Sequence, residues 1–144
     1  MKKCYSIRLF PTDQQINQLK ELSDIRKEIW NKLLDIEQTE YQTNKSRLNK
    51  FDLNNLLPSL KEQYPNWKKL NSKAIQTIST ELFGSYRSFF NLIKKDKTAR
   101  PPKKIEDNNF HTISFNQSGW SIKNNNTIII NKISLNYKSK INLV

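Results

Sequence analysis

The sequence has 144 residues, of which 25 are Lys or Arg and 13 are Asp or Glu, so its formal net charge is +12. Cys4 is the only cysteine, which excludes an internal disulfide and a thiolate zinc cluster and fits a reducing compartment. No apolar run is long enough for a signal peptide or a bilayer span, so we expect a cytoplasmic protein without a membrane partner.

The first elements are predicted to be a strand and a long helix. Residues 3–10 alternate with a period of two, which indicates a strand that Pro11 ends. Thr12 and Gln15 have the spacing of a capping box, in which each side chain accepts a hydrogen bond from the other residue's backbone amide. Apolar residues then recur at three- and four-residue steps as far as Tyr41, which predicts one long amphipathic helix.

A shorter helix is expected next. Residues 42–47 are polar and predict a connection, and residues 51–60 predict a helix that Pro58 kinks or splits, because a proline inside a helix lacks a backbone donor. Residues 64–67, Tyr-Pro-Asn-Trp, have the composition of a turn.

A third helix and a basic segment follow. Asn71 and Ser72 offer an N-cap for a helix that runs to about Lys95. Gly84 weakens a helix by roughly 1 kcal/mol relative to alanine, so its presence predicts close approach of another backbone. Residues 94–104 combine lysines, an arginine and a proline pair, which predicts an extended basic linker.

The rest of the chain is predicted to be rich in strands, because its apolar period changes to two. Asparagine and glycine tolerate the backbone of tight turns, so two Asn-rich stretches are read as hairpin turns. The candidate strands are residues 110–115, 120–123 and 127–131, the alternating Ile133, Leu135 and Tyr137, and residues 140–144; the candidate turns are residues 116–119 and 124–126.

No complete catalytic constellation is visible, and we expect neither a cofactor nor a metal site. His111 is the only histidine, and its expected role is that of a solvent-facing strand residue rather than a general base. Cys4 is expected to be a small, half-buried hydrophobe rather than a nucleophile. Tyr86, Phe89 and Phe90 share helical spacing, which favours core packing over stacking on bases.

Basic residues gather in three parts of the chain. Should they converge in the fold, they would form a groove for a phosphate backbone, and binding would depend on salt. The alternative is a disordered linker whose charge serves solubility. The three groups are Lys2, Lys3 and Arg8; residues 94–104; and Lys138 and Lys140.

Several short strings occur in order between residues 5 and 123. They are Ile7-Arg8-Leu9-Phe10-Pro11-Thr12, Ile29-Trp30-Asn31, Asp52-Leu53 with Leu56-Leu57, Tyr64-Pro65 with Trp67, Asn71-Ser72 with Gln76, Tyr86-Arg87-Ser88-Phe89-Phe90, Pro101-Pro102-Lys103, Phe110, and Phe115-Asn116-Gln117-Ser118-Gly119. In this order the chain resembles the N-terminal portion of the TnpB (OrfB) proteins of insertion sequences, which are relatives of type V CRISPR effectors.

The resemblance and the periodicity agree on an α+β fold. A helical recognition insert of three main helices would lie within a small antiparallel wedge-like β-barrel or sheet. Both a complete and an incomplete barrel fit the number of candidate strands. The expected units are residues 1–11, the first strand of the wedge-like domain; 12–96, the helical recognition domain; 97–109, a basic linker; and 110–144, the β-rich remainder of the wedge-like domain.

In that family these parts hold a guide RNA and read a short DNA motif next to the target, and a following RuvC-like domain cuts with three acidic residues. Amide side chains suit motif reading, because they present a donor and an acceptor to adenine. The alternative is that Ser72 only caps a helix and that Asn116 and Gln117 only form a turn. The resemblance carries motif reading to Ser72, Gln76, Asn116 and Gln117, and to Lys50 and Asn54 as further candidates.

Lysine and arginine side chains are expected to contact the phosphate backbone of the bound RNA or DNA. The residues expected to do so are Arg8, Lys73, Arg87, Lys94, Lys95, Arg100, Lys103 and Lys104.

We therefore predict a nucleic-acid-binding, TnpB-like protein. The sequence ends at Val144, before a RuvC-like segment would begin, so we expect binding without cleavage and a separate RuvC-like chain as a candidate partner. The alternative is a structural or protein-interaction module that acts with a separate catalytic chain. A free-standing nuclease would require clustered carboxylates, which the sequence does not have.

Overall fold

The structure, a computed structural model, describes residues 3–44, 50–116 and 118–138. Within those ranges it contains three α-helices, a short 3-10 helix and a four-stranded antiparallel sheet, so the predicted α+β class is confirmed. The side chain of Lys50 lies outside the described residues, as do Lys2, Gln117 and the strand predicted for residues 140–144.

The long first helix, α1, spans Asp13–Asn44 and is 32 residues long. The capping box forms as predicted. The Thr12 backbone N–H donates to Gln15 Oε1 at 2.9 Å, and the Gln15 backbone N–H donates to Thr12 Oγ1 at 3.3 Å. Residues 42–44 continue the helix, so the connection predicted for residues 42–47 begins too early in the sequence.

The second helix, α2, spans Lys50–Gln63 as one element, although Pro58 lies inside it. The loss of one backbone donor is offset by burial of the neighbouring Leu57 and Leu60 against the core. The predicted turn at residues 64–67 is instead the start of a 3-10 helix, η1, over Pro65–Lys69. This helix places Trp67 in the core with 1% of its surface exposed.

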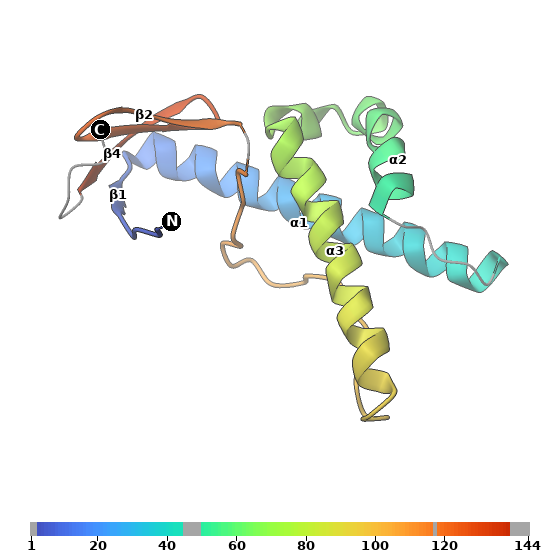
Figure 1. Cartoon of the computed structure of the whole chain (residues 1–144). Coiled ribbons are helices and arrows are strands. Elements are labelled where there is room, and N and C mark those ends of the chain that lie inside the picture. The colour runs from blue at the N-terminus through green and yellow to red at the C-terminus, as the bar shows by residue number, and fades with distance from the viewer. Residues whose placement is uncertain (1–2, 45–49, 117, 139–144) are drawn as a thin grey trace.

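The third helix, α3, spans Ser72–Ile93 and crosses α1 (Figure 1). The side chain of Asn71 caps it by accepting from the backbone N–H groups of Lys73 at 3.0 Å and Ala74 at 3.2 Å. The close approach predicted at Gly84 is wrong, because a Cβ built there would meet nothing within 4 Å.

The main hydrophobic core lies between the three helices and η1. The apolar residues that recur in α1 and α3 lie on the facing sides of these helices and supply most of this core. Its largest fully buried side chains are Ile29, Leu33, Leu34, Leu53, Trp67, Leu70, Ile75 and Leu82.

The sheet consists of β1 (Arg8–Phe10), β2 (Trp120–Asn124), β3 (Thr127–Ile130) and β4 (Ile133–Lys138), in the order β1-β4-β3-β2. The chain's first strand therefore pairs with its last described one, and the sheet is open rather than a closed barrel. Figure 1 shows it over the N-terminal end of α1. The first strand is shorter than residues 3–10, and Cys4 before it is exposed rather than half-buried.

A second, smaller core fixes the sheet to α1. Leu135 is fully buried there, and Leu19 of α1 packs against the same cluster. The side-chain amide of Gln15 also donates to the backbone oxygen of Ser134 at 2.6 Å. The start of α1 and the sheet are therefore held together by apolar and polar contacts.

The strand predicted for residues 110–115 is wrong, because these residues form an irregular segment. Their alternation arises from packing on the helices, since Ile113 and Phe115 lie against the main core. The backbone N–H of His111 donates to the hydroxyl of Ser23 in α1 at 2.9 Å. In a strand, this N–H would donate to a backbone oxygen of a neighbouring strand instead. No strand therefore precedes β2 among residues 110–116, so the hairpin turn predicted at residues 116–119 is wrong.

Candidate nucleic-acid interface

A groove lies where α3 begins and the sheet comes closest to it. Its volume is about 680 Å³, and its walls come from η1, the first residue of α3, β2, β3 and the turn after β3. Its lining residues are Lys68, Lys69, Leu70, Asn71, Ser72, Gly119, Trp120, Ser121, Ile129, Asn131 and Lys132. Three lysines and the half-exposed Trp120 make this groove basic and partly aromatic.

Asn131 joins the two walls of the groove. Its side chain accepts from the Asn71 backbone N–H at 2.8 Å and donates to the backbone oxygen of Lys69 at 2.7 Å. Asn131 and Lys132 both have positive φ, 50° and 68°, which gives the two-residue turn its tight shape. The hairpin turn is therefore fastened to the junction between η1 and α3.

Gly119 lets the chain enter β2 beside the cap of α3. Its φ is +91°, and a Cβ there would stand 2.8 Å from Asn71 Cγ and 2.8 Å from Phe115 Cδ1. Only glycine fits both the backbone conformation and the space. The loop before β2 is thereby held against the first turn of α3.

Three of the predicted motif-reading residues lie near the start of α3, and of these Ser72 also lines the groove. Ser72 and Gln76 lie one turn apart on the exposed side of α3. Asn116 is also exposed, and its side-chain nitrogen is 3.5 Å from the hydroxyl of Thr77 in the same helix. The Ser72 hydroxyl accepts from Lys61 at 3.2 Å, and Asn71, not Ser72, is the N-cap.

The other candidates for motif reading lie elsewhere or are not described. Asn54 accepts from the buried hydroxyl of Ser79, so its side chain ties α2 to α3. The positions of the Gln117 residue and the Lys50 side chain lie outside the described residues.

The cations around the groove differ in their partners. Lys68 pairs with Glu62 at 3.1 Å and Lys69 with Glu21 at 2.5 Å. Lys73 on the first turn of α3 is exposed and has no carboxylate partner within the described part of the chain. Arg87 is also exposed, but it follows Lys73 by 14 residues, or roughly 21 Å along the helix axis.

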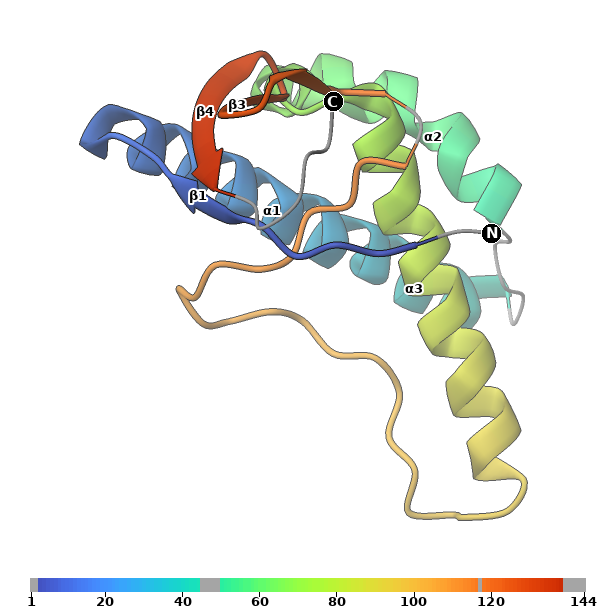
Figure 2. The same cartoon turned by 60° about the vertical axis from the view of Figure 1, so that its left-hand side comes forward.

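The basic segment after α3 turns back from the end of that helix in a wide loop (Figure 2) and contacts α1 in its last residues. Lys94 directly follows the end of α3 and lies roughly 33 Å along the helix axis from Ser72. Lys95 and Arg100 come after it in the chain. From Lys103 onward the chain contacts α1, where the indole N–H of Trp30 donates to the backbone oxygen of Lys103 at 3.0 Å. We call residues 103–111 the docked segment.

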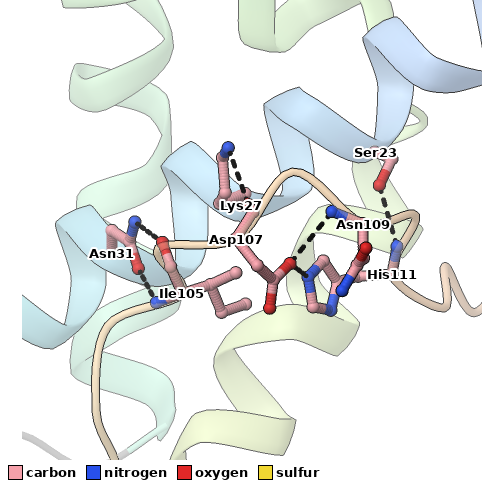
Figure 3. A network of polar contacts seen from close by, with 7 residues as sticks. All are labelled: Ser23, Lys27, Asn31, Ile105, Asp107, Asn109 and His111. Carbon is pink, nitrogen blue, oxygen red and sulfur yellow. Dashed lines mark hydrogen bonds and ion pairs between the residues drawn. The ribbon is translucent and has the colours of Figure 1, made fainter.

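Polar side chains one turn apart on α1 hold the docked segment (Figure 3). The Asn31 side chain hydrogen-bonds both the backbone N–H and the backbone oxygen of Ile105, and Lys27 Nζ donates to the backbone oxygen of Asp107 at 3.3 Å. Lys104 pairs with Asp35 at 2.8 Å. The Lys104 side chain and the Lys103 backbone are therefore positioned by α1. The linker predicted for residues 94–104 is not extended throughout, because residues 94–95 and 97–98 form turns, and its end is docked on the helix.

The His111 ring and the Asp107 carboxylate are hydrogen-bonded at the end of the docked segment, with Nε2 and Oδ1 2.7 Å apart. The hydrogen bond from His111 and that from the Asn109 backbone N–H lower the pKa of the Asp107 carboxyl below its ordinary 3.8. His111 is half-buried in an irregular segment, so its predicted place on a solvent-facing strand is wrong.

Arg8 meets the other end of the chain. It pairs in register with Lys138 across β1 and β4, and both cations lie over the ring of Phe10. The far end of α3, which Lys94 and Lys95 follow directly in the chain, is remote from this place (Figure 1). The predicted basic residues thus form separate groups on the sheet, at the start of α3 and along the segment after it.

Sequence reasoning missed the contribution of Asn131, Lys132 and Trp120 to the groove. The signal for the first two was present, because Asn-Lys separates the isoleucine run 128–130 from the alternating Ile133, Leu135 and Tyr137, and asparagine tolerates positive φ. The described residues contain no group of three His, Cys, Asp or Glu side chains placed to hold a metal ion. In the same residues no helix is long and apolar enough to cross a bilayer.

Residues 1–46 match the family model of the helix-turn-helix domain of OrfB proteins of IS605-type insertion sequences. No curated protein matches the chain. In the described part of the matched region, residues 3–44, the structure has β1 and one continuous helix, so a two-helix unit is not formed there. The match supports DNA binding in an insertion-sequence setting. Over these residues, about a third of the chain, the sequence is therefore similar to the N-terminal domain of OrfB insertion-sequence proteins.

Proposed function

We propose that the chain is a TnpB-like binding module that reads a short DNA motif beside a target, holds a guide RNA, and leaves cleavage to a separate RuvC-like chain. The motif reader would be the exposed first turns of α3 with the loop before β2. The lysines around the groove would hold the phosphates on either side of the motif.

The observation that carries this proposal is the placement of Gln76 beside Asn116 and Lys73. The Gln76 side chain is exposed and makes no hydrogen bond within the described residues. Its amide can therefore offer both a donor and an acceptor to adenine in the major groove. Lys73 is three residues earlier on the same helix, where it can reach the neighbouring phosphate.

The experiment is fluorescence anisotropy with a pool of short duplex DNA of random sequence, followed by sequencing of the bound fraction. We expect the wild-type chain to enrich a short motif and to lose affinity steeply as salt rises, because bound lysines displace counterions. Binding that does not change with salt, or a bound pool without enrichment, contradicts motif reading.

Two substitutions separate the roles of the amide and the lysine. Gln76→Ala should remove the preference at one base pair, at a cost of about 1–3 kcal/mol for that base. Lys73→Gln should weaken binding to every sequence and lower the salt slope by about one. Gln18→Ala and Lys20→Gln change exposed residues of α1 and are the matched controls.

The alternative function is a protein-interaction module, and the open sheet favours it. The strand β2 lies at one edge with Trp120 49% exposed, and an unpaired edge can add a strand from another chain. Light scattering after size exclusion distinguishes the two functions. A stable oligomer without nucleic acid, together with no binding of DNA or RNA, supports the alternative.

Incubation of DNA with the purified chain and Mg²⁺ tests the proposed lack of cleavage. Cutting by the wild-type chain alone would overturn this part of the proposal without affecting motif reading.

A further inference from the structure

The two ends of the sequence carry no acidic residue. Residues 1–12 and 108–144 contain seven of the 25 basic residues and none of the 13 acidic ones, so they supply +7 of the formal charge of +12. The sheet is built from these two parts of the chain alone, with β1 from the first and β2, β3 and β4 from the second. The described strands therefore carry Arg8, Lys123 and Lys138 and no carboxylate, while every carboxylate side chain lies between residues 13 and 107.

The outer face of the sheet presents an aromatic ring between two cations. Arg8 and Phe10 point to the same side of β1, because side chains alternate along a strand. The Arg8 guanidinium lies 5.6 Å from the centre of the Phe10 ring, and Lys138 Nζ lies 5.4 Å from it. Phe10 remains 42% exposed, whereas Leu9 and Tyr137 turn to the small core beneath.

This arrangement is costly for the sheet by itself. Arg8 and Lys138 stand directly opposite each other, and like charges in that position destabilise a pair of strands. Among residues 3–44, 50–116 and 118–138, no carboxylate forms an ion pair with either cation. An exposed aromatic ring between two unneutralised cations suits a ligand that is both anionic and flat.

We propose that this outer face binds an unpaired strand of nucleic acid, with one base stacked on Phe10 and the flanking phosphates held by Arg8 and Lys138. The proposal rests on the nucleic-acid-binding function above and assigns it a second site. Asn136 is the register partner of Phe10 and is exposed, so its amide can hydrogen-bond the edge of the stacked base.

An unpaired strand fits this face better than a duplex or an acidic peptide. The bases of a duplex are stacked on one another, so their faces cannot rest on Phe10, whereas an unpaired base can. An acidic peptide could pair with Arg8 and Lys138 but has no flat group for the ring. The site thus differs in ligand from the groove at the start of α3.

The test compares two labelled probes of equal length, about 12 nucleotides: oligoadenylate and an abasic deoxyribose-phosphate strand. Phe10→Leu keeps an apolar side chain but removes the stacking ring. We expect it to weaken oligoadenylate binding by roughly tenfold and to change abasic-strand binding by less than about twofold. The double variant Arg8→Gln with Lys138→Gln should weaken binding of both probes.

Two further variants keep the test independent of folding. Phe10→Tyr retains a ring and should bind oligoadenylate like the wild type. Phe110→Leu removes a ring that is 57% exposed in the docked segment, and it should also bind like the wild type. Equal losses for Phe10→Leu and Phe110→Leu would overturn the proposal.

The outcomes separate this inference from the proposed function. Wild-type binding of oligoadenylate that Phe10→Leu leaves unchanged overturns the site on the sheet but leaves nucleic-acid binding in place. A wild-type chain that binds neither RNA nor DNA overturns both. An oligoglutamate peptide that displaces oligoadenylate as well as unlabelled oligoadenylate does would also overturn the site, because charge alone would then explain it.

Discussion

Asn31 binds the backbone of Ile105 with both ends of its side-chain amide: Nδ2 donates to the Ile105 oxygen at 3.0 Å, and Oδ1 accepts from the Ile105 N–H at 2.8 Å. Asn31 thereby offers the docked segment the pair of bonds that a neighbouring strand would offer. The segment between α3 and the sheet is consequently held against α1, and the positions of Lys103 and Lys104 follow from it.

Substitution of Asn31 by leucine should release the docked segment. Both backbone groups of Ile105 lose their partner, and we expect a loss of about 1–3 kcal/mol in the free energy of unfolding, measured by urea denaturation. Hydrogen exchange at the Ile105 amide should accelerate. Asn17→Leu on the same helix changes an exposed residue and is the control. Unchanged exchange at Ile105 would show that Asn31 does not hold the segment.

Gly119→Ala should be strongly destabilising. The new Cβ would stand 2.8 Å from both Asn71 Cγ and Phe115 Cδ1, and φ of +91° is strained for any residue with a side chain. We expect a loss of at least about 1–3 kcal/mol in the free energy of unfolding. Loosening of the loop before β2 should also weaken motif reading by Asn116. A variant as stable as the wild type would contradict this local geometry.

Gly84→Ala should have the opposite effect. Gly84 is exposed inside α3, and an added Cβ would meet nothing within 4 Å. Alanine is favoured over glycine in a helix by roughly 1 kcal/mol, so the thermal unfolding midpoint should rise. The nearby aromatic residues and the nucleic-acid affinity should not change. A lower midpoint would mean that another surface approaches this side of α3.

The helices were predictable because their signals are local. The capping box at Thr12 and Gln15 and the N-cap at Asn71 each lie within a few residues of the backbone groups they bind. Periodic apolar residues fixed the buried sides of α1 and α3 for the same reason. Three of the four strands were also predicted close to their observed bounds after residue 119, where the turns contain asparagine.

The irregular segment before β2 was not predictable from its own residues. Ile113 and Phe115 alternate as in a strand, but they face the helical core, which is formed by residues far away in the sequence. The docked segment did leave one local signal: Ser23, Lys27 and Asn31 recur at steps of four on one side of α1. A polar row of this kind is equally typical of a solvent-exposed helix face, so it does not by itself indicate a bound segment.

At the candidate site, too, local contacts could be predicted from the sequence and contacts between distant residues could not. Gln76 and Ser72 could be placed together from the sequence because they lie one turn apart on one helix. The pairing of Arg8 with Lys138 could not, since it depends on a register between strands that are separated by nearly the whole chain. Convergence of basic residues was therefore found for the sheet, whereas Lys94 and Lys95 lie far from it.

Acid should loosen the docked segment only at low pH. The pKa of Asp107 is lowered by hydrogen bonds from His111 and the Asn109 N–H, so the folded state favours the carboxylate. A lowered pKa contributes stability above the ordinary value of 3.8, and that contribution is lost as pH falls through the folded-state value below 3.8. The hydrogen bonds of the Asp107 carboxylate within the segment should therefore persist from neutral pH down to about pH 4.

Asp107→Asn tests this assignment, because it removes the titrating carboxylate and keeps the size of the side chain. In the wild type, NMR signals of the His111 ring and the Asn109 amide should shift together as Asp107 is protonated. In the variant that shared shift should be absent, and the Asn109 amide should already exchange faster at neutral pH. Asp96→Asn is the control, because Asp96 has a carboxyl pKa that is likewise lowered, by hydrogen bonds from Thr98, but lies outside the docked segment. A shared shift that persists in Asp107→Asn would mean that another group drives the acid response.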